Sequence, residues 1–353
     1  MRSVIYMLFF MLNCTLLQAQ TTDVITNLSR PTGIHFEGSE LYIIETAGGR
    51  ISKINTTDTN PIATEIVSFG SDAFGIDLRG SELYFTYNFH NTIAKIDISQ
   101  SNPSIEDIAS IGTNLAGDKV LLIEDELFLA RSNTGTDWML SKMDITSSNP
   151  IFEDVITNLD VSSSGMRVYN DVLYFAEQFN NRVMRLDLTD PNPVPELYRD
   201  NLQGPFALEL QASYLYVGER DLNRVVRFNL DDLNEEMEVV VNTEFSPRSL
   251  AILNDELYIA ETLGDKITKV DIPILSTIDY SNNDIQLTPN PTNDFVQVHS
   301  TIRLNQFKIY NLTGVLVAKG RLNVHSEIQL EQLDSGIYFI ELDDEWVFKI
   351  LKN

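Results

Sequence analysis

The feature that most constrains the fold of this 353-residue chain is a segment that returns six times at nearly constant spacing. The segment predicts a strand, a tight turn and a second strand, as in Glu40–Asn55 (ELYIIETAGGRISKIN) and Glu256–Asp271 (ELYIAETLGDKITKVD). Successive copies lie 42 to 46 residues apart. Their marker aromatic residues are Tyr42, Tyr84, Phe128, Tyr174, Tyr216 and Tyr258. Because the apolar runs are short, each period predicts one four-stranded unit of sheet.

A period of this length with four strands is typical of a β-propeller blade, so we expect an all-β fold. In the fourth repeat the strands are predicted at Phe152–Asn158, Gly165–Val168, Leu173–Ala176 and Arg182–Leu188. Five repeats carry a small residue nine positions before the aromatic: Gly33, Gly75, Gly165, Ala207 and Ser249. Small side chains suit the innermost strands, which crowd around the axis. In the third repeat Gly117 stands eleven residues before Phe128, which predicts a hairpin two residues longer.

The two ends of the repeat region predict how the ring closes. The sixth repeat runs through Lys266–Ile272 and meets Pro273 without a fourth strand. Asp23–Asn27 reads DVITN, identical to Asp154–Asn158 in a predicted strand of the fourth repeat. We therefore expect a six-bladed propeller over residues 22–272, in which the N-terminal strand completes the last blade and removes an exposed edge.

The pattern of Arg30–Asn55 resembles an NHL repeat or its relatives among six-bladed propellers. The resemblance extends over all six repeats. It implies a fold and leaves the function open, because such propellers serve as binding platforms, lactonases and lyases.

The composition changes after a predicted linker at 273–284. Residues 285–353 predict short strands joined by Gly and Asn turns, and therefore a small β-sandwich. Three motifs follow in order: Leu287–Asp294 (LTPNPTND), Phe307–Val317 (FKIYNLTGVLV) and Leu333–Leu342 (LDSGIYFIEL). They closely resemble the C-terminal sorting domain (type A, Por) of the type IX secretion system of Bacteroidetes. The resemblance implies export by that machinery across both membranes, followed by release or anchoring at the cell surface.

Residues 1–19 fit a secretory signal peptide, with Arg2, an apolar run over Val4–Leu17 and a small residue, Ala19, at the cleavage site. Cys14, the single cysteine, leaves acylation of a lipoprotein as an alternative. After cleavage at Ala19 we expect a secreted or cell-surface chain without thiols and without a transmembrane segment. The formal charge of −26 argues against nucleic acid as a partner.

Charged residues recur at fixed offsets from the aromatic in four repeats. The acids three residues after it are Glu45, Glu177, Glu219 and Glu261, and the bases eight residues after it are Arg50, Arg182, Arg224 and Lys266. In the second repeat Tyr87 and Thr92 replace the pair, and in the third Arg131 and Met139 do. Because acid and base change together, they predict cross-strand ion pairs. The alternative is a divalent cation bound by these carboxylates, and the sequence indicates no other cofactor.

The hairpins of the second and third repeats have an unusual composition for surface loops. They contain Tyr87, Asn88, Phe89, His90, Arg131, Asn133, Asp137 and Trp138. Aromatic residues beside Arg and Asn predict a recognition surface for a glycan, a peptide or a protein. The alternative is that Phe89 and Trp138 only cover the edge of a blade.

A third set lies two residues past each small residue and is expected near the axis. Its members are His35, Asp77, Lys119, Arg167 and Glu209, with Ala251 in the sixth repeat. Their charges sum to about zero, which favours mutual pairing around a water-filled channel. His35 beside Asp77 is the best pair for proton transfer. The favoured function is a ligand-binding module, and the alternative is a metal-dependent hydrolase, lactonase or lyase at the channel mouth. The sequence does not decide whether the chain is an enzyme and leans against it.

Overall fold

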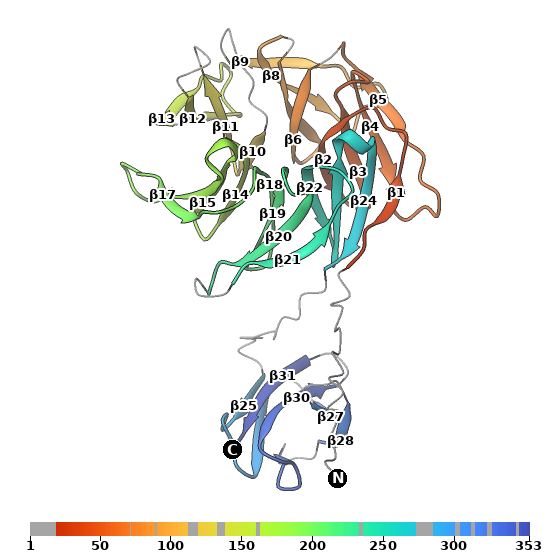
Figure 1. Ribbon diagram of the computed structural model, residues 1–353, viewed down its shortest axis with the longest axis vertical. Coiled ribbons are helices and arrows are strands. Elements are labelled where there is room, and N and C mark those ends of the chain that lie inside the picture. Colours follow the sequence, from red (N-terminus) through yellow and green to blue (C-terminus); the bar gives the residue numbers. More distant parts are fainter. Residues whose placement is uncertain are drawn as a thin grey trace, which may run out of the picture. The chain divides into compact units, whose positions relative to one another are not determined.

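The computed structural model describes residues 19–70, 72–88, 90–111, 119–132, 138–159, 163–232, 236–272, 285–300, 304–311, 315–322, 327–343 and 346–353. The chain divides into two compact units, Met1–Ile272 and Pro273–Asn353, and the regular structure of both is almost entirely strand (Figure 1). The predicted signal peptide, apart from Ala19, and the predicted linker at 273–284 lie outside the described residues.

The described part of the first unit contains six antiparallel four-stranded sheets, numbered here in chain order. Sheet 1 consists of β2 (Pro31–Glu37), β3 (Glu40–Glu45), β4 (Arg50–Asn55) and β5 (Thr64–Ser68). Sheet 2 consists of β6 (Ala73–Arg79), β7 (Glu82–Tyr87), β8 (Thr92–Asp97) and β9 (Glu106–Ser110). Sheet 3 consists of β10 (Val120–Ile123), β11 (Glu126–Ser132), β12 (Trp138–Asp144) and β13 (Glu153–Leu159).

The other three sheets repeat this order. Sheet 4 consists of β14 (Ser163–Tyr169), β15 (Val172–Glu177), β16 (Arg182–Asp187) and β17 (Glu196–Arg199). Sheet 5 consists of β18 (Pro205–Gln211), β19 (Tyr214–Glu219), β20 (Arg224–Asn229) and β21 (Glu238–Asn242). Sheet 6 consists of β22 (Pro247–Leu253), β23 (Glu256–Glu261), β24 (Lys266–Asp271) and β1 (Thr22–Ile25). Single 3-10 turns, η1 (Gln178–Asn180) and η2 (Thr262–Gly264), follow β15 and β23.

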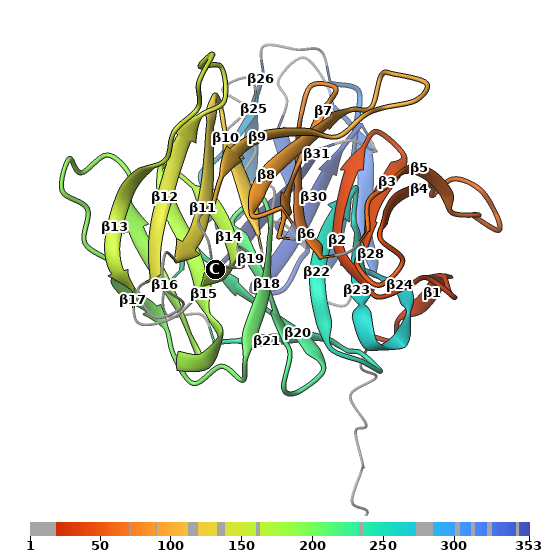
Figure 2. The same cartoon turned by 90° about the horizontal axis from the view of Figure 1, so that it is seen from above.

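The sheets are arranged as in a β-propeller. Figure 2 shows the first strands, β2, β6, β10, β14, β18 and β22, in the middle of the unit, with the other strands of each sheet farther out. Neighbouring first strands contact each other, and β2 contacts both β6 and β22, so the row of sheets closes on itself. The all-β class and the propeller arrangement expected from the repeats are confirmed.

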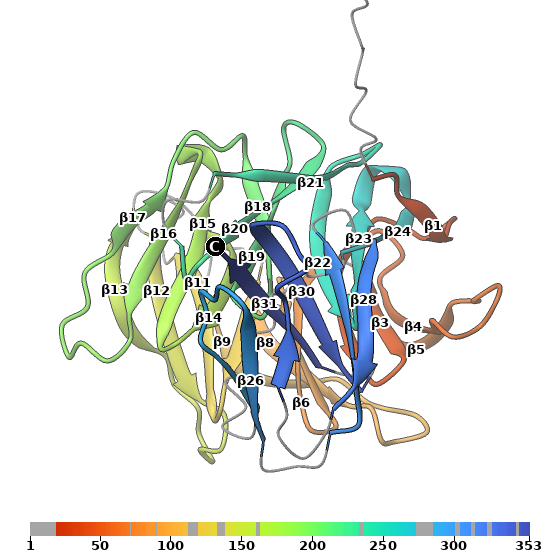
Figure 3. The ribbon, with the colours of Figure 1, turned by 90° about the horizontal axis from the view of Figure 1, so that it is seen from below.

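The N-terminal strand supplies the outer edge of sheet 6. β1 pairs antiparallel with β24, with Thr22 opposite Lys269 and Asp23 opposite Thr268. Figure 3 shows β1 beside β24 at the periphery. The Asp23 carboxylate also lies 3.1 Å from the Lys266 ammonium of β24. The two ends of the repeat region are thus joined by the strand pairing that the DVITN segment predicts.

Small residues on the first strands are required by the first strand of the next sheet. A Cβ added to Gly165 would lie 2.6 Å from the Leu208 nitrogen and 2.7 Å from the Phe206 oxygen, both in β18. A Cβ on Gly33 would lie 3.0 Å from Ile76 Cγ2 in β6. Since backbone atoms cannot move aside as a flexible side chain can, the restriction is strictest at Gly165.

Sheet 3 departs from the alignment predicted for its inner strand. Leu121 pairs with Phe128, whereas His35 pairs with Tyr42 in sheet 1. The hairpin closes at Ile123 opposite Glu126, as in the other sheets, so the longer hairpin predicted from Gly117 is wrong. Gly117 itself lies outside the described residues. Lys119, nine residues before Phe128, therefore takes the position of the small residue.

The second strands are buried on both faces because each sheet is covered by its two neighbours. In β3, Leu41 and Ile43 belong to the apolar cluster shared with sheet 6, whereas Ile44 belongs to the cluster shared with sheet 2. The repeated Tyr is amphipathic. The Tyr42 hydroxyl donates to Glu40 at 3.2 Å, and the same carboxylate accepts from Lys53. Sheets 2 and 6 repeat this set with Tyr84, Glu82 and Lys95, and with Tyr258, Glu256 and Lys269.

The second unit has its own core. One sheet consists of β25 (Ile285–Thr288), β26 (Phe295–Ser300) and β29 (Glu327–Gln329). The other has the order β28 (Leu316–Arg321), β27 (Gln306–Asn311), β30 (Gly336–Leu342) and β31 (Trp346–Lys352). A single buried cluster contains Val296 and Ile328 of the first sheet with Ile309 and Ile340 of the second.

Candidate functional site

Hydrogen bonds in sheet 1 explain why a glutamate recurs at the same position in four of the hairpins. Glu45 is fully buried at the end of β3 and accepts bonds from Arg50 Nε at 2.8 Å and Arg50 Nη2 at 2.9 Å. It also accepts from Ser52 Oγ at 2.6 Å and from the Ser29 N–H at 2.8 Å. Burial alone raises the pKa of Glu45, but these hydrogen bonds outweigh burial and lower it. The carboxylate thus fastens the hairpin to the loop that enters the sheet.

Two of the other predicted ion pairs form in the same way. Glu177 pairs with Arg182 and Glu219 with Arg224. The fourth predicted pair is wrong: Lys266 stands opposite Glu261 in register, but its ammonium lies 3.1 Å from Asp23 and 2.9 Å from Glu244. The reason is the closing strand, which brings Asp23 to β24. Glu261 instead accepts from the Phe245 N–H and the Thr268 hydroxyl.

Sheet 3 keeps an ion pair at this position with the charges reversed. Arg131 replaces the glutamate and lies 2.7 Å from the Asp154 carboxylate on β13. Ser141 accepts from Arg131 Nε at 2.8 Å and donates to Asp154 at 2.7 Å. The Arg131 side chain is only 12 % exposed and lies over the Phe152 ring. It therefore connects three strands of its own sheet, β11, β12 and β13.

Sheet 2 replaces the ion pair with aromatic packing. Tyr87 is 5 % exposed, and its ring centroid lies 5.7 Å from that of Phe69 and 4.3 Å from the His90 ring. His90 Nδ1 lies 3.0 Å from Asp107, which also accepts from the Thr92 hydroxyl. The Asn88 side-chain oxygen is buried and has no hydrogen-bond partner among the described residues.

The residues of the predicted recognition surface therefore differ in accessibility. Tyr87 and Arg131 are strand residues with mostly buried side chains, in contrast to the loop placement expected for them. The His90 side chain is 45 % exposed, and Trp138 is half-buried against the apolar cluster of sheets 3 and 4. Phe89, Asn133 and Asp137 lie outside the described residues.

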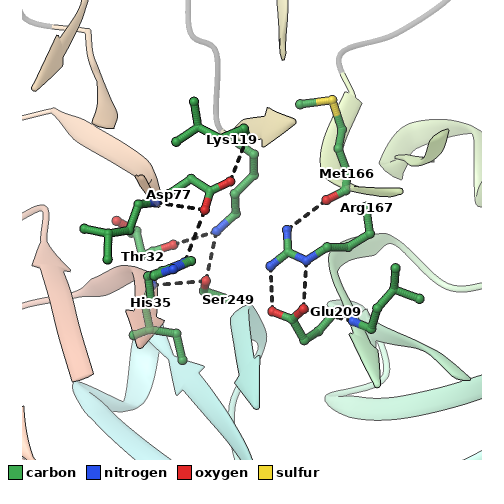
Figure 4. Close-up of polar contacts among 12 residues, drawn as sticks. Thr32, His35, Asp77, Lys119, Met166, Arg167, Glu209 and Ser249 are labelled. Atoms are coloured by element: carbon green, nitrogen blue, oxygen red, sulfur yellow. Dashed lines mark hydrogen bonds and ion pairs between the residues drawn. The ribbon is translucent and has the colours of Figure 1, made fainter. Parts of the chain in front are cut away.

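The residues predicted near the axis form a polar network on the first strands (Figure 4). His35 Nδ1 lies 3.4 Å from Asp77 Oδ1, a long contact for a hydrogen bond. Asp77 is also held by the Leu78 and Leu122 N–H groups, at 2.9 and 2.8 Å. The Lys119 ammonium reaches sheets 1 and 6, donating to the Thr32 carbonyl at 3.0 Å and the Ser249 hydroxyl at 3.1 Å.

The other half of this network is an arginine–glutamate pair. Arg167 donates two hydrogen bonds to Glu209, at 2.8 and 2.6 Å, and a third to the Met166 carbonyl. Burial lowers the pKa of Arg167, but the Glu209 carboxylate outweighs burial and raises it. These five side chains hold neighbouring sheets together across the axis. Within the described residues, no group of three or more His, Cys, Asp or Glu is placed to hold a metal ion.

A pocket that the sequence did not predict lies between sheets 5, 6 and 1. Its volume is ≈ 350 Å³. It is lined by Arg30, Arg220, Asn223, Phe245, Ser246, Arg248, Thr262 and Leu263. Arg248 lies in β22, and the other lining residues come from loops entering the first strands and from hairpins between second and third strands. The available signal was weak: Arg30 and Arg248 each stand within three residues before an inner-strand small residue.

Comparison with known families identifies the second unit. Residues 286–352 match the family described as secretion system C-terminal sorting domain. The chain carries a type IX sorting domain. The sorting domain directs export to the cell surface or the medium through the type IX secretion machinery, as its three motifs predicted. Among the described residues, no helix has the length and apolar character needed to cross a bilayer.

Solved structures with the propeller fold are similar to this chain. A luciferin-regenerating enzyme is 14% identical, with a TM-score of 0.60 over 72% of this chain and 95% of its own. A virginiamycin B lyase from Staphylococcus aureus is 16% identical, with a TM-score of 0.53 over 72% and 99%. YjhT is 12% identical, with a TM-score of 0.54 over 72% and 97%. At these identities the likeness establishes the fold alone. No curated protein matches the chain in sequence.

Proposed function

We propose that this chain is an exported six-bladed β-propeller, closed by its N-terminal strand, that binds a ligand outside the cell. A signal peptide at residues 1–19 begins the export route, and a small β-sandwich at 285–353 carries the address for the second step. The six described sheets, the β1–β24 pairing and the sorting domain support this assignment. The ligand belongs to the glycans, peptides or proteins met at a cell surface.

The arginine-lined pocket is the observation that carries the proposal. A recess of ≈ 350 Å³ with an aromatic wall and a few polar groups has the size and chemistry of a ligand site. His90 and Trp138 lie on the hairpins of sheets 2 and 3, the same kind of hairpin that supplies Arg220 and Leu263 to the pocket. The predicted recognition surface is therefore retained as a second part of the binding face.

The binding function is tested by presenting the full chain to arrays of glycans and peptides. We expect saturable binding of at least one ligand, reduced about tenfold by Arg248→Gln or by His90→Ala combined with Trp138→Ala, because each change removes contacts from one part of the face. Arg185→Gln is the matched control: Arg185 pairs with Glu196 on sheet 4 and does not line the pocket. No retained ligand, or equal retention by every variant, would contradict the proposal.

The alternative function is a metal-dependent hydrolase, lactonase or lyase at the channel mouth. The half-exposed His35 beside Asp77 favours it, since a histidine oriented by a carboxylate is a common general base. Incubating each retained ligand with the protein and a divalent cation separates the two functions. Turnover that His35→Asn abolishes would assign the chain to the enzymes.

A further inference from the structure

We propose that the arginine-lined pocket binds the carboxylate of an acidic peptide segment whose neighbouring side chains are apolar. The inference rests on the proposed binding function and names the ligand class of that same site.

The charge of the pocket is opposite to that of the chain. The full sequence carries a formal charge of −26, yet Arg30, Arg220 and Arg248 line one recess. No acidic residue is among the described residues that line it, although Asp221, next to Arg220, partly offsets the charge of that arginine. Arg30 is exposed and its guanidinium forms no ion pair among the described residues, although its backbone N–H donates to the Asp265 carboxylate at 2.9 Å. A local cluster of cations on an acidic surface attracts anions selectively to that place.

Two of the arginines are held in position before any ligand arrives. Arg248 lies over the Phe206 ring, 3.8 Å from its centroid. Arg220 Nε donates to the adjacent Asp221 at 2.7 Å, and its guanidinium lies 6.0 Å from the Phe179 ring centroid. Stacking uses the face of a guanidinium, whereas a carboxylate binds at its edge, so the two contacts are compatible. Preorganised side chains lose less entropy on binding, which favours affinity.

An unpartnered hydroxyl points to a ligand with hydrogen-bonding oxygens. Ser246 lines the pocket and is 8 % exposed, and its Oγ has no hydrogen-bond partner among the described residues. Buried hydroxyls are nearly always hydrogen-bonded, because an unmade bond is costly in a folded protein. A carboxylate oxygen bound by the arginines can accept a hydrogen bond from the Ser246 hydroxyl and remove that cost.

The rim distinguishes a peptide from a polysaccharide. Leu263, which lines the pocket, is 68 % exposed, and Phe179, beside Arg220, is 69 % exposed. Leu222 on the intervening hairpin is 48 % exposed. Exposed apolar side chains gathered on adjacent hairpins mark a surface that is covered by a partner. Leucine side chains pack well against the apolar side chains of a peptide and poorly against the hydroxyl groups of a sugar chain.

Two pools of fluorescent pentapeptides test the inference with the full-length protein. Both pools carry Leu, Phe, Val or Ala at the four outer positions, and the central residue is Glu in one pool and Gln in the other. We expect the Glu pool to bind about tenfold more tightly by fluorescence anisotropy, since hydrogen bonds to a charged group exceed those to a neutral one. Added salt should weaken binding of the Glu pool more than that of the Gln pool.

Variants connect the binding to the pocket. Arg248→Gln and Arg30→Gln should each reduce affinity for the Glu pool by about tenfold, whereas Arg185→Gln should leave it unchanged. Arg30 is an exposed side chain, so its variant remains informative if Arg248→Gln fails to fold. Equal affinity for the two pools, or full affinity in both pocket variants, would overturn the inference.

The outcomes separate this inference from the proposed function. If the pools fail to bind and the arrays retain a neutral glycan, the carboxylate inference falls and the binding function stands. If polygalacturonate binds and Arg248→Gln abolishes that binding, the pocket belongs to an acidic sugar and the peptide assignment is overturned. If no peptide or glycan binds, both proposals fail.

Discussion

At the scale of single residues, the hairpin glutamates illustrate how a charge can be buried when hydrogen bonds satisfy its oxygens. Glu45 satisfies its oxygens with a guanidinium and a hydroxyl from β4 and with a backbone N–H from the loop that enters β2. Arg131 shows that the same position tolerates the opposite charge when Asp154 on β13 supplies the carboxylate. Where this position carries a charge, the requirement is therefore a satisfied polar contact rather than a negative charge as such, and in sheet 2 the aromatic packing of Tyr87 replaces it.

Glu45→Gln should destabilise the first unit by about 2–4 kcal/mol at pH 7, because it leaves Arg50 without its buried carboxylate. Because the folded pKa of Glu45 is lowered, its stabilisation is present above the ordinary value of about 4.3 and is lost as the pH falls through the folded pKa. Urea unfolding should therefore show a shallower loss of stability below about pH 4.3 in the variant than in the wild type. Glu65→Gln is the control, since Glu65 is half-exposed and lies 4.0 Å from Arg50, farther than Glu45 at 2.8 Å. An equal loss of stability with falling pH in the variant and the wild type would refute this account.

At the scale of elements, one short strand determines whether the row of sheets has an open edge. β1 has four residues, and its pairing register with β24 shifts between Asp23 and Ile25. It covers the outer edge of β24 and supplies Asp23 to Lys266. Without β1, the N–H and C=O groups along that edge would face water and be open to pairing with another chain.

Removal of residues 20–25 should lower the thermal unfolding midpoint and cause self-association, because it exposes the edge of β24. Circular dichroism and size-exclusion chromatography at increasing concentration measure the two effects. Removal of Gln20 and Thr21 alone, which precede the strand, is the matched control. A truncated protein that stays monomeric with an unchanged midpoint would show that the strand is dispensable.

The sequence predicts the sheets and their strand pairing well, because a comparison of the repeats shows which residues occupy equivalent positions. The DVITN match predicts a pairing between segments that are 247 residues apart. Alignment on small residues fails in sheet 3, because Lys119 occupies the small-residue position and extends across the axis. The pocket of Arg30, Arg220 and Arg248 escaped prediction because three sheets contribute residues at unrelated offsets. Repeats reveal what the sheets share, whereas binding sites arise from what differs between them.

At the scale of the whole molecule, the chain combines a propeller with a second compact unit that directs export. The second unit has its own buried apolar cluster, and its three motifs identify it as a sorting domain without reference to the propeller. Because all three motifs lie within residues 286–352, we expect sorting to be independent of the domain that is exported with them.

Deletion of residues 286–353 should retain the protein inside the cell envelope, because the sorting domain directs the second export step. Immunoblotting of the medium and protease treatment of intact cells measure the loss. A carrier protein bearing residues 1–19 at its start and 273–353 at its end should leave the cell, which controls for effects of the propeller. Undiminished export of the truncated chain would contradict this role.

The clasp between the chain's beginning and its last propeller strand has a consequence for synthesis. Thr22 is made among the first residues, yet the carbonyl it binds belongs to Lys269. The N-terminal segment of a nascent chain therefore stays unpaired until β24 has been synthesised. The entropic cost of closing so long a loop must be met before the β1–β24 contact adds stability. Chains that end before β24 lack the strand with which β1 pairs, so β1 cannot complete sheet 6 in them. The β1–β24 pairing thus forms only in chains that extend through β24, at Asp271.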